Sequence, residues 1–74
     1  MNDVYPVLVE PYEGYGRAFV WGVYSTEQKA KEVLRTIAEK HNLELFDDVA
    51  YNLDEPSMKN RYEKASFQHL FMND

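Results

Sequence analysis

The clearest pattern in the chain lies in residues 25–41, which read STEQKAKEVLRTIAEKH. Ser25 followed by Gln28 forms a capping box, which marks the start of a helix. Asn42 suits the left-handed position after the last helical turn. Apolar side chains and one histidine recur every three or four positions, as on one face of a helix; they are Ala30, Val33, Leu34, Ile37, Ala38 and His41. The stretch therefore predicts an amphipathic helix that begins at Ser25 and ends near His41.

The residues before this helix predict a β-hairpin. Residues 4–12 are rich in β-formers but include two prolines, which cannot donate a ladder hydrogen bond, so we expect a strand with restricted pairing. Two glycines in residues 13–17 permit a tight chain reversal. Residues 18–24, AFVWGVY, form the second strand. Strict alternation would turn its larger side chains toward the core: Phe19, Trp21 and Val23.

The C-terminal part predicts one more strand and a weaker helix. Residues 49–53 alternate as a third strand that adds to the hairpin. Ser57 can cap a second helix, in which Met58, Tyr62, Ala65, Ser66 and His69 follow helical spacing. The apolar tail, residues 67–72, is expected to dock on the body or on another chain. The predicted fold is α+β, a single small domain over residues 1–74 in the order β-β-α-β-α.

Size and composition narrow the possible functions. The chain has 74 residues, with 8 Lys+Arg against 13 Asp+Glu and a net charge of -5. A chain this short buries only about 60 % of its unfolded surface, which leaves little room for a deep pocket. We therefore expect no cofactor. The absence of cysteine favours a reducing, cytoplasmic setting. No apolar run approaches the roughly 20 residues of a membrane span, and the N-terminus lacks a signal peptide, so no membrane partner is expected.

The residue types that carry catalysis form no recognised motif. Ser25 and Ser57 are explained as helix caps, and no Gly-x-Ser-x-Gly elbow occurs. His41 falls on the apolar stripe of the first helix, where a partly buried imidazole is the ordinary explanation. The acidic residues lack the spacing of a calcium loop. The sequence therefore predicts a protein that is not an enzyme and has no metal site.

A tyrosine-rich turn is the first candidate site. Tyr12 and Tyr15 flank the glycine turn, which also holds Glu13 and Arg17. Tyr and Arg are enriched at interface hot spots, because they give a large contact area at small entropy cost. The alternative is cross-strand pairing that only stabilises the hairpin. The four residues are therefore candidate partner-binding residues.

An acidic stretch is the second candidate site. No Lys or Arg lies between His41 and Met58, and the acidic residues there are Glu44, Asp47, Asp48, Asp54 and Glu55. Such a surface can engage a protein whose basic groove is built for nucleic acid. The alternative is an acidic loop that keeps a small protein in solution. The same negative charge argues against direct nucleic-acid binding, which depends on Lys and Arg.

The N-terminal part resembles a group of small uncharacterised proteins of phages and bacteria. The resemblance lies in YEGY at residues 12–15 and WGVYSTEQKA at residues 21–30, where a "YEG" hairpin leads into a helix start of the "GVYST-E-KA" type. It covers about the first forty residues. It implies a phage or mobile-element context, in which tiny non-enzymatic proteins bind and block one host protein.

Three functional hypotheses follow. The first is a non-enzymatic protein-binding module, a phage-type inhibitor of a host nucleic-acid-handling or defence protein with a basic surface, acting in the host cytoplasm. The alternative is a structural protein that completes its core as a homodimer, through its apolar tail and surplus aromatic residues. The third is an aromatic platform for single-stranded nucleic acid, which would show salt-sensitive binding to short oligonucleotides.

Overall fold

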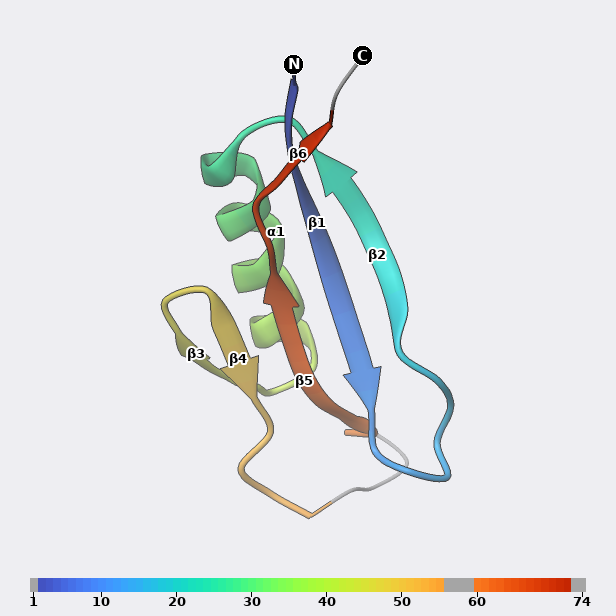
Figure 1. The fold of residues 1–74 in the computed structure, drawn as a ribbon. Helices are drawn as coiled ribbons and strands as arrows, with labels where there is room; N and C mark the ends of the chain where they lie inside the picture. Colours follow the sequence, from blue (N-terminus) through green and yellow to red (C-terminus); the bar gives the residue numbers. More distant parts are fainter. Residues whose placement is uncertain (1, 56–59, 73–74) are drawn as a thin grey trace.

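The computed structural model describes residues 2–55 and 60–72. In this part of the chain, an antiparallel sheet carries a single helix on one face (Figure 1). The molecule is elongated, with extents of 42 × 21 × 14 Å. In chain order, the elements are β1 (Asn2–Pro11), β2 (Phe19–Tyr24), α1 (Glu27–Lys40), β3 (Glu44–Phe46), β4 (Val49–Tyr51), β5 (Tyr62–Phe67) and β6 (Leu70–Met72).

Strand β1 lies inside the sheet, so the prediction of restricted pairing was wrong. The strand order is β2-β1-β5-β4-β3, and β6 pairs separately with the start of β1. Residues 2–4 of β1 pair with β6, and residues 7–11 pair with β5. Pro6 falls between these two segments, where its carbonyl accepts a hydrogen bond from the Gln68 amide at 3.1 Å. Its missing N–H therefore coincides with the junction between two partner strands and interrupts neither.

The second helix of the predicted β-β-α-β-α order was also wrong, because residues 62–67 and 70–72 form strands β5 and β6. Ala65 and Phe67 are buried, whereas the alternate residues Lys64 and Ser66 are partly exposed, which is the period of a strand. Strand β5 is hydrogen-bonded on both sides, to β1 and β4. These distant partners override the helical spacing in the sequence. The expected cap Ser57 lies outside the described residues.

The third predicted strand, residues 49–53, corresponds to β4, but it does not add to the first hairpin. Strand β4 pairs with β3 in a second hairpin, whose turn contains Asp47 with a φ of 62°. On its other side β4 pairs with β5, which separates it from β1. The sheet is therefore two hairpins joined through β5.

Strand β2 contains a bulge that reverses its alternation. Val7 pairs with Gly22 but Leu8 pairs with Val20, so Trp21 is the extra residue. Directly paired residues point to the same face, which places Val20 and Val23 on the face away from α1. The prediction that Val23 faces the core was wrong: its side chain is 59% exposed.

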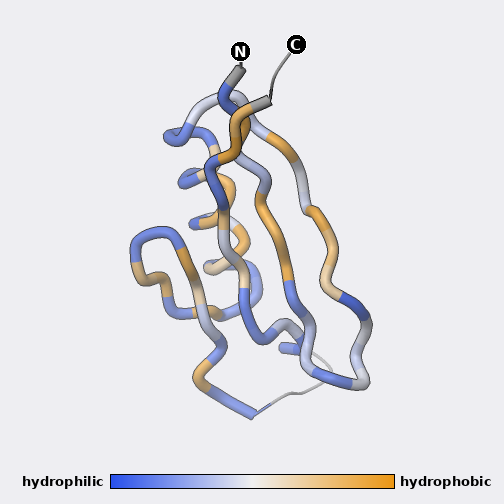
Figure 2. Tube along the Cα trace, viewed as in Figure 1, coloured by the Kyte–Doolittle hydropathy of each residue, from blue (hydrophilic) through white to orange (hydrophobic). Residues whose placement is uncertain are grey.

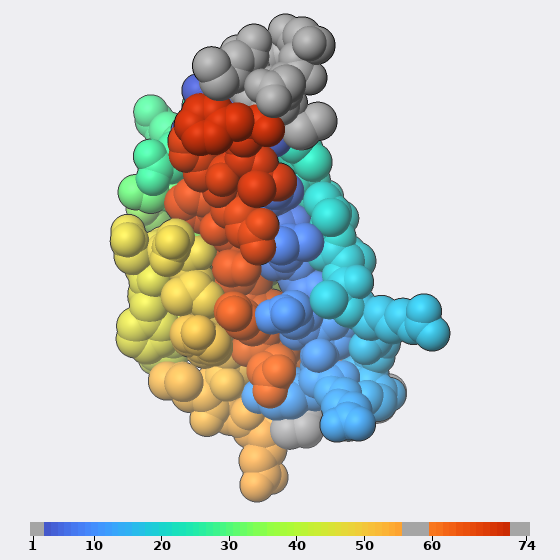
Figure 3. Space-filling view, in the orientation of Figure 1, coloured from blue at the N-terminus to red at the C-terminus, as the bar shows by residue number. Residues whose placement is uncertain are grey.

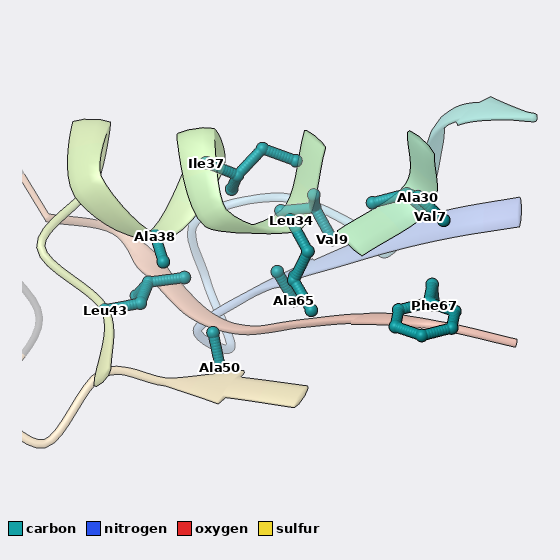
Figure 4. Packing of buried hydrophobic residues seen from close by; sticks show 10 residues of the cluster. All are labelled: Val7, Val9, Ala30, Leu34, Ile37, Ala38, Leu43, Ala50, Ala65 and Phe67. Atoms are coloured by element: carbon teal, nitrogen blue, oxygen red, sulfur yellow. The ribbon is translucent and has the colours of Figure 1, made fainter. Parts of the chain in front are cut away.

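The first helix is confirmed, with one shift at its start. The N-cap is Thr26, not Ser25, and its hydroxyl accepts a hydrogen bond from the Lys29 amide at 3.1 Å. His41 is the C-cap, and Asn42 has the expected left-handed φ, 55°. Ala30, Leu34, Ile37 and Ala38 of the predicted apolar stripe are buried against the sheet, and Val33 and His41 are partly buried (Figure 4).

Alanines and β-branched residues form the floor beneath α1 (Figure 4). Ala50 of β4 and Ala65 of β5 are paired and fully buried, and their small size lets the helix approach the sheet. The buried core consists of Val7, Val9, Ala30, Leu34, Ile37, Ala38, Leu43, Ala50, Ala65 and Phe67. Figure 3 shows the opposite face of the sheet, on which no described helix lies; in this view β6 covers the start of β1, and β2 is open.

Candidate functional site

Tyr12, the first predicted binding residue, ties two loops together at one end of the molecule. Its hydroxyl donates to the backbone carbonyl of Asp54 at 2.8 Å and lies 3.3 Å from that of Asn52. Its amide donates to the carbonyl of Arg61 at 2.9 Å. Partial burial, with the negative charges of Glu63 and Asp54, raises the pKa of Tyr12, which keeps the hydroxyl a donor. Tyr12 thus has a structural role at this end.

The other residues of the predicted turn are exposed. Gly14 and Gly16 have φ values of 91° and 129°, which a residue with a side chain rarely adopts. Glu13, Tyr15 and Arg17 project around them, and Tyr15 is 41% exposed. The hydrogen bond from the Tyr12 hydroxyl to the Asp54 carbonyl joins the turn to one of the predicted acidic residues.

The acidic residues lie on two separate segments. Glu44 is on β3, and Asp47 and Asp48 form the β3–β4 turn, whereas Asp54 and Glu55 follow β4. The Asp47 carboxylate is 3.9 Å from the Lys31 ammonium of α1. Since a cation lies beside Asp47, the surface around the β3–β4 turn is of mixed charge. Among residues 2–55 and 60–72, no group of three His, Cys, Asp or Glu is placed to hold a metal ion.

The outer edge of β2 is a feature that sequence reasoning missed. Among the described residues, strand β2 is the last strand of the sheet and pairs only with β1 (Figure 1). Its sequence, FVWGVY, contains neither a charge nor a proline. Figure 2 shows hydrophobic segments along this outer strand. The exposed fractions of its side chains are 40% for Phe19, 53% for Val20, 38% for Trp21 and 59% for Val23. The signal was present as aromatic density, but only the topology shows that the strand is an edge.

A groove runs between β2 and α1, on the helix side of this edge. Its volume is about 320 Å³. Trp21 and Tyr24 line it from the strand side, and the helix lines it through the partly buried Val33 and the buried Ile37. Polar and charged side chains line its rim: Lys29, Glu32, Thr36 and Lys40. We call this the β2–α1 groove.

The His41 ring packs against the aromatic rings of Trp21 and Tyr62. The ring lies edge-on to Trp21, with centroids 6.2 Å apart, and to Tyr62 at 4.5 Å. Its Nε2 atom is buried and has no hydrogen-bond partner among the described residues. Burial lowers the pKa of His41, and the charges of Lys40 and Arg61 lower it further, so the neutral ring is favoured. His41 therefore packs as an aromatic residue.

His69 connects β6 to the start of β1. Its Nε2 atom is 3.0 Å from the Asp3 carboxylate, and its ring stacks on Tyr5 with centroids 4.7 Å apart. The tail thus docks on the body of the same chain.

Comparisons with known protein families, curated proteins and solved structures found no match to this chain. In the described part of the chain, no helix is both long and apolar enough to cross a membrane.

Proposed function

We propose that this chain is a non-enzymatic protein-binding module whose contact surface is the outer edge of β2, which has no partner strand in the described part of the chain. One observation carries the proposal: an edge strand without a charge or a proline leaves Phe19, Val20, Trp21 and Val23 exposed. Natural sheets commonly protect such edges with charges, prolines or a covering element. An uncharged edge rich in aromatic residues is a surface suited to another polypeptide.

The test uses lysine as a blocking residue on this edge. Val20→Lys with Val23→Lys places two charges on side chains that are 53% and 59% exposed, so the fold should tolerate them. The matched control is Leu53→Lys, a 67% exposed residue away from the edge. Each protein is used to capture partners from a lysate of cells that express it. The double variant should lose the captured partner, and Leu53→Lys should retain it. Equal capture by both would contradict the use of this edge.

A narrower form of the proposal concerns the partner. The net charge of -5 and the acidic residues Asp54 and Glu55 support a phage-type inhibitor that binds a basic, nucleic-acid-handling or defence protein in the host cytoplasm. Reversing both charges to Lys should then slow association with the captured partner and flatten its dependence on salt. An unchanged association rate would limit the proposal to a module for a partner without a basic surface.

Homodimerisation is the alternative for the same edge. The apolar tail, one of the two features that suggested a dimer, pairs with β1 within the chain. Sedimentation at micromolar concentration separates the hypotheses, because a persistent monomer leaves the β2 edge free for another protein. Binding of short oligonucleotides, if observed, would instead support the stacking-platform hypothesis.

A further inference from the structure

We infer that the β2–α1 groove binds an extended segment of the partner protein, which adds a strand to β2 and carries the pattern acidic–x–apolar–x–acidic. This inference rests on the proposed function and specifies its ligand. Its basis is the position of the groove: it lies beside the one long edge of the sheet that is unpaired in the described structure.

Strand addition explains why an edge and a groove occur together. A strand that pairs with β2 directs alternate side chains to the helix side of the sheet. There, a large apolar side chain would contact Trp21, Tyr24 and Val33. The volume of about 320 Å³ is at the lower end of ligand pockets, which suits a side chain or two and not a large cofactor.

The two x residues of the bound segment would point to the face of the sheet away from α1. Val20 and Val23 are exposed there. Their exposure favours β-branched or other apolar residues at the x positions of the segment.

The charged side chains at the rim of the groove determine which residues the bound segment carries at its two outer positions. Lys29 and Lys40 lie toward opposite ends of the groove, about 16 Å apart along the axis at the rise of an α-helix. In an extended segment with the pattern acidic–x–apolar–x–acidic, the two acidic positions lie four residues apart, about 13 Å, and the flexible lysine side chains cover the remaining distance. Neither ammonium has an ion-pair partner among the described residues, whereas Lys31 has two carboxylates within 4.0 Å. Glu32 lies between the two lysines, which disfavours an acidic residue at the centre.

A second copy of the chain does not satisfy this pattern. Strand β2 itself has no acidic residue. Glu44, Phe46 and Asp48 have the required spacing, but β3 ends at Phe46, and Asp47 has a φ of 62°, so this segment turns instead of extending. The occupant is therefore a segment of a different protein.

The binding test uses blocked heptapeptides and the complete chain. One peptide is Thr-Asp-Val-Phe-Val-Asp-Thr, and its counterpart has Lys in place of each Asp. Trp21 is the only tryptophan, so its fluorescence reports on the groove directly. We expect the Asp peptide to bind at least about tenfold more tightly than the Lys peptide. Lys29→Glu with Lys40→Glu should reverse this preference, and Arg35→Glu, an exposed charge change on α1 outside the lining, should leave it intact.

Strand pairing itself is tested with N-methylated peptides. In an antiparallel or parallel pair, only alternate amides face the neighbouring strand. Methylating one alternate set of amides should therefore abolish binding of the Asp peptide, and methylating the other set should preserve it. Protection of the β2 amides from hydrogen exchange should accompany binding.

Several results would overturn the inference: no fluorescence change with the Asp peptide, equal binding of both peptides, or equal binding of both methylated sets. A dimer that protects the β2 amides without peptide would also overturn it. If the peptide tests contradict binding in the groove but Val20→Lys with Val23→Lys still abolishes capture, the proposed protein-binding function stands and only this ligand is wrong. If those two lysines leave capture unchanged, the proposed function itself fails at this edge.

Discussion

At the scale of single residues, His41 shows how packing determines protonation. The ring lies against Trp21 and Tyr62, and its buried Nε2 atom has no hydrogen-bond partner in the part of the chain that the structure describes. A helix C-terminus favours a charged imidazole. Burial works in the opposite direction, and the pKa of His41 is lowered. Desolvation, followed by the positive charges of Lys40 and Arg61, thus favours the neutral ring at this position.

The lowered pKa predicts a pH-dependent stability. Since the folded pKa lies below the unfolded one, the unfolded chain binds more protons as the pH falls. The contribution of His41 to the free energy of unfolding is therefore complete above the unfolded pKa, about 6.5, and is lost as the pH falls through the folded pKa. Urea unfolding at about pH 7.5 and about pH 5 measures this loss.

The control for this prediction compares the two histidines. His41→Leu should reduce the loss of stability between the two pH values. His69→Gln should still show the loss that His41 causes. An unchanged pH dependence in His41→Leu would show that burial of this ring does not control its titration.

At the scale of elements, helix α1 was predictable because its signals are local. The apolar stripe and the caps involve residues a few positions apart, and the structure confirms the helix from Glu27 to Lys40. The start differed by one residue because Ser25 and Thr26 both carry a hydroxyl. The extended backbone of Thr26, with φ of -133° and ψ of 149°, decides between them.

The assignment of Thr26 as the N-cap predicts that substitutions at Thr26 and Ser25 lower the free energy of unfolding by different amounts. Thr26→Ala removes the acceptor of the Lys29 amide and should lower the free energy of unfolding by about 1 kcal/mol. Ser25→Ala should change it by less than about 0.5 kcal/mol, as at an ordinary surface position. Chemical denaturation of both variants provides the measurement. If Ser25→Ala lowers the free energy of unfolding more than Thr26→Ala does, the N-cap is Ser25.

Strand β5 shows where local signals fail. Residues 62–69 have an apolar spacing compatible with a helix, yet residues 62–67 pair with β1 and β4. The register joins Val9 to Ala65 and Ala50 to Ala65, residues far apart in the chain. No short-range pattern contains this information, because the partner strands decide the conformation.

At the scale of the whole molecule, the sheet has one covered face and one open face. Ala65 is buried under α1, whereas its neighbour Ser66 points to the open face. Ala65→Val should overpack the helix–sheet contact and cost about 1–3 kcal/mol of stability. Ser66→Val introduces the same side chain without a helix above it and should stay within about 0.5 kcal/mol of the parent. Equal costs, measured by thermal or urea unfolding, would contradict this assignment of faces.

The candidate site was only partly accessible from the sequence. The tyrosine-rich turn was identified, but its Tyr12 hydroxyl is committed to the backbone of residues 52–54. The acidic stretch was identified, but it is divided between the β3–β4 hairpin and the loop after β4. The β2 edge was missed, since an edge is defined by the strand that is absent beside it.

The sequence by itself determined α1, the first hairpin, the acidic balance and the glycine turn, because each depends on composition or on residues a few positions apart. Only the tertiary structure decided that β1 lies inside the sheet, that the C-terminal part is strand, and that β2 is an open edge beside a groove. The physical reason is that backbone hydrogen bonds in a sheet join distant segments, so pairing and exposure exist only after the whole chain has folded.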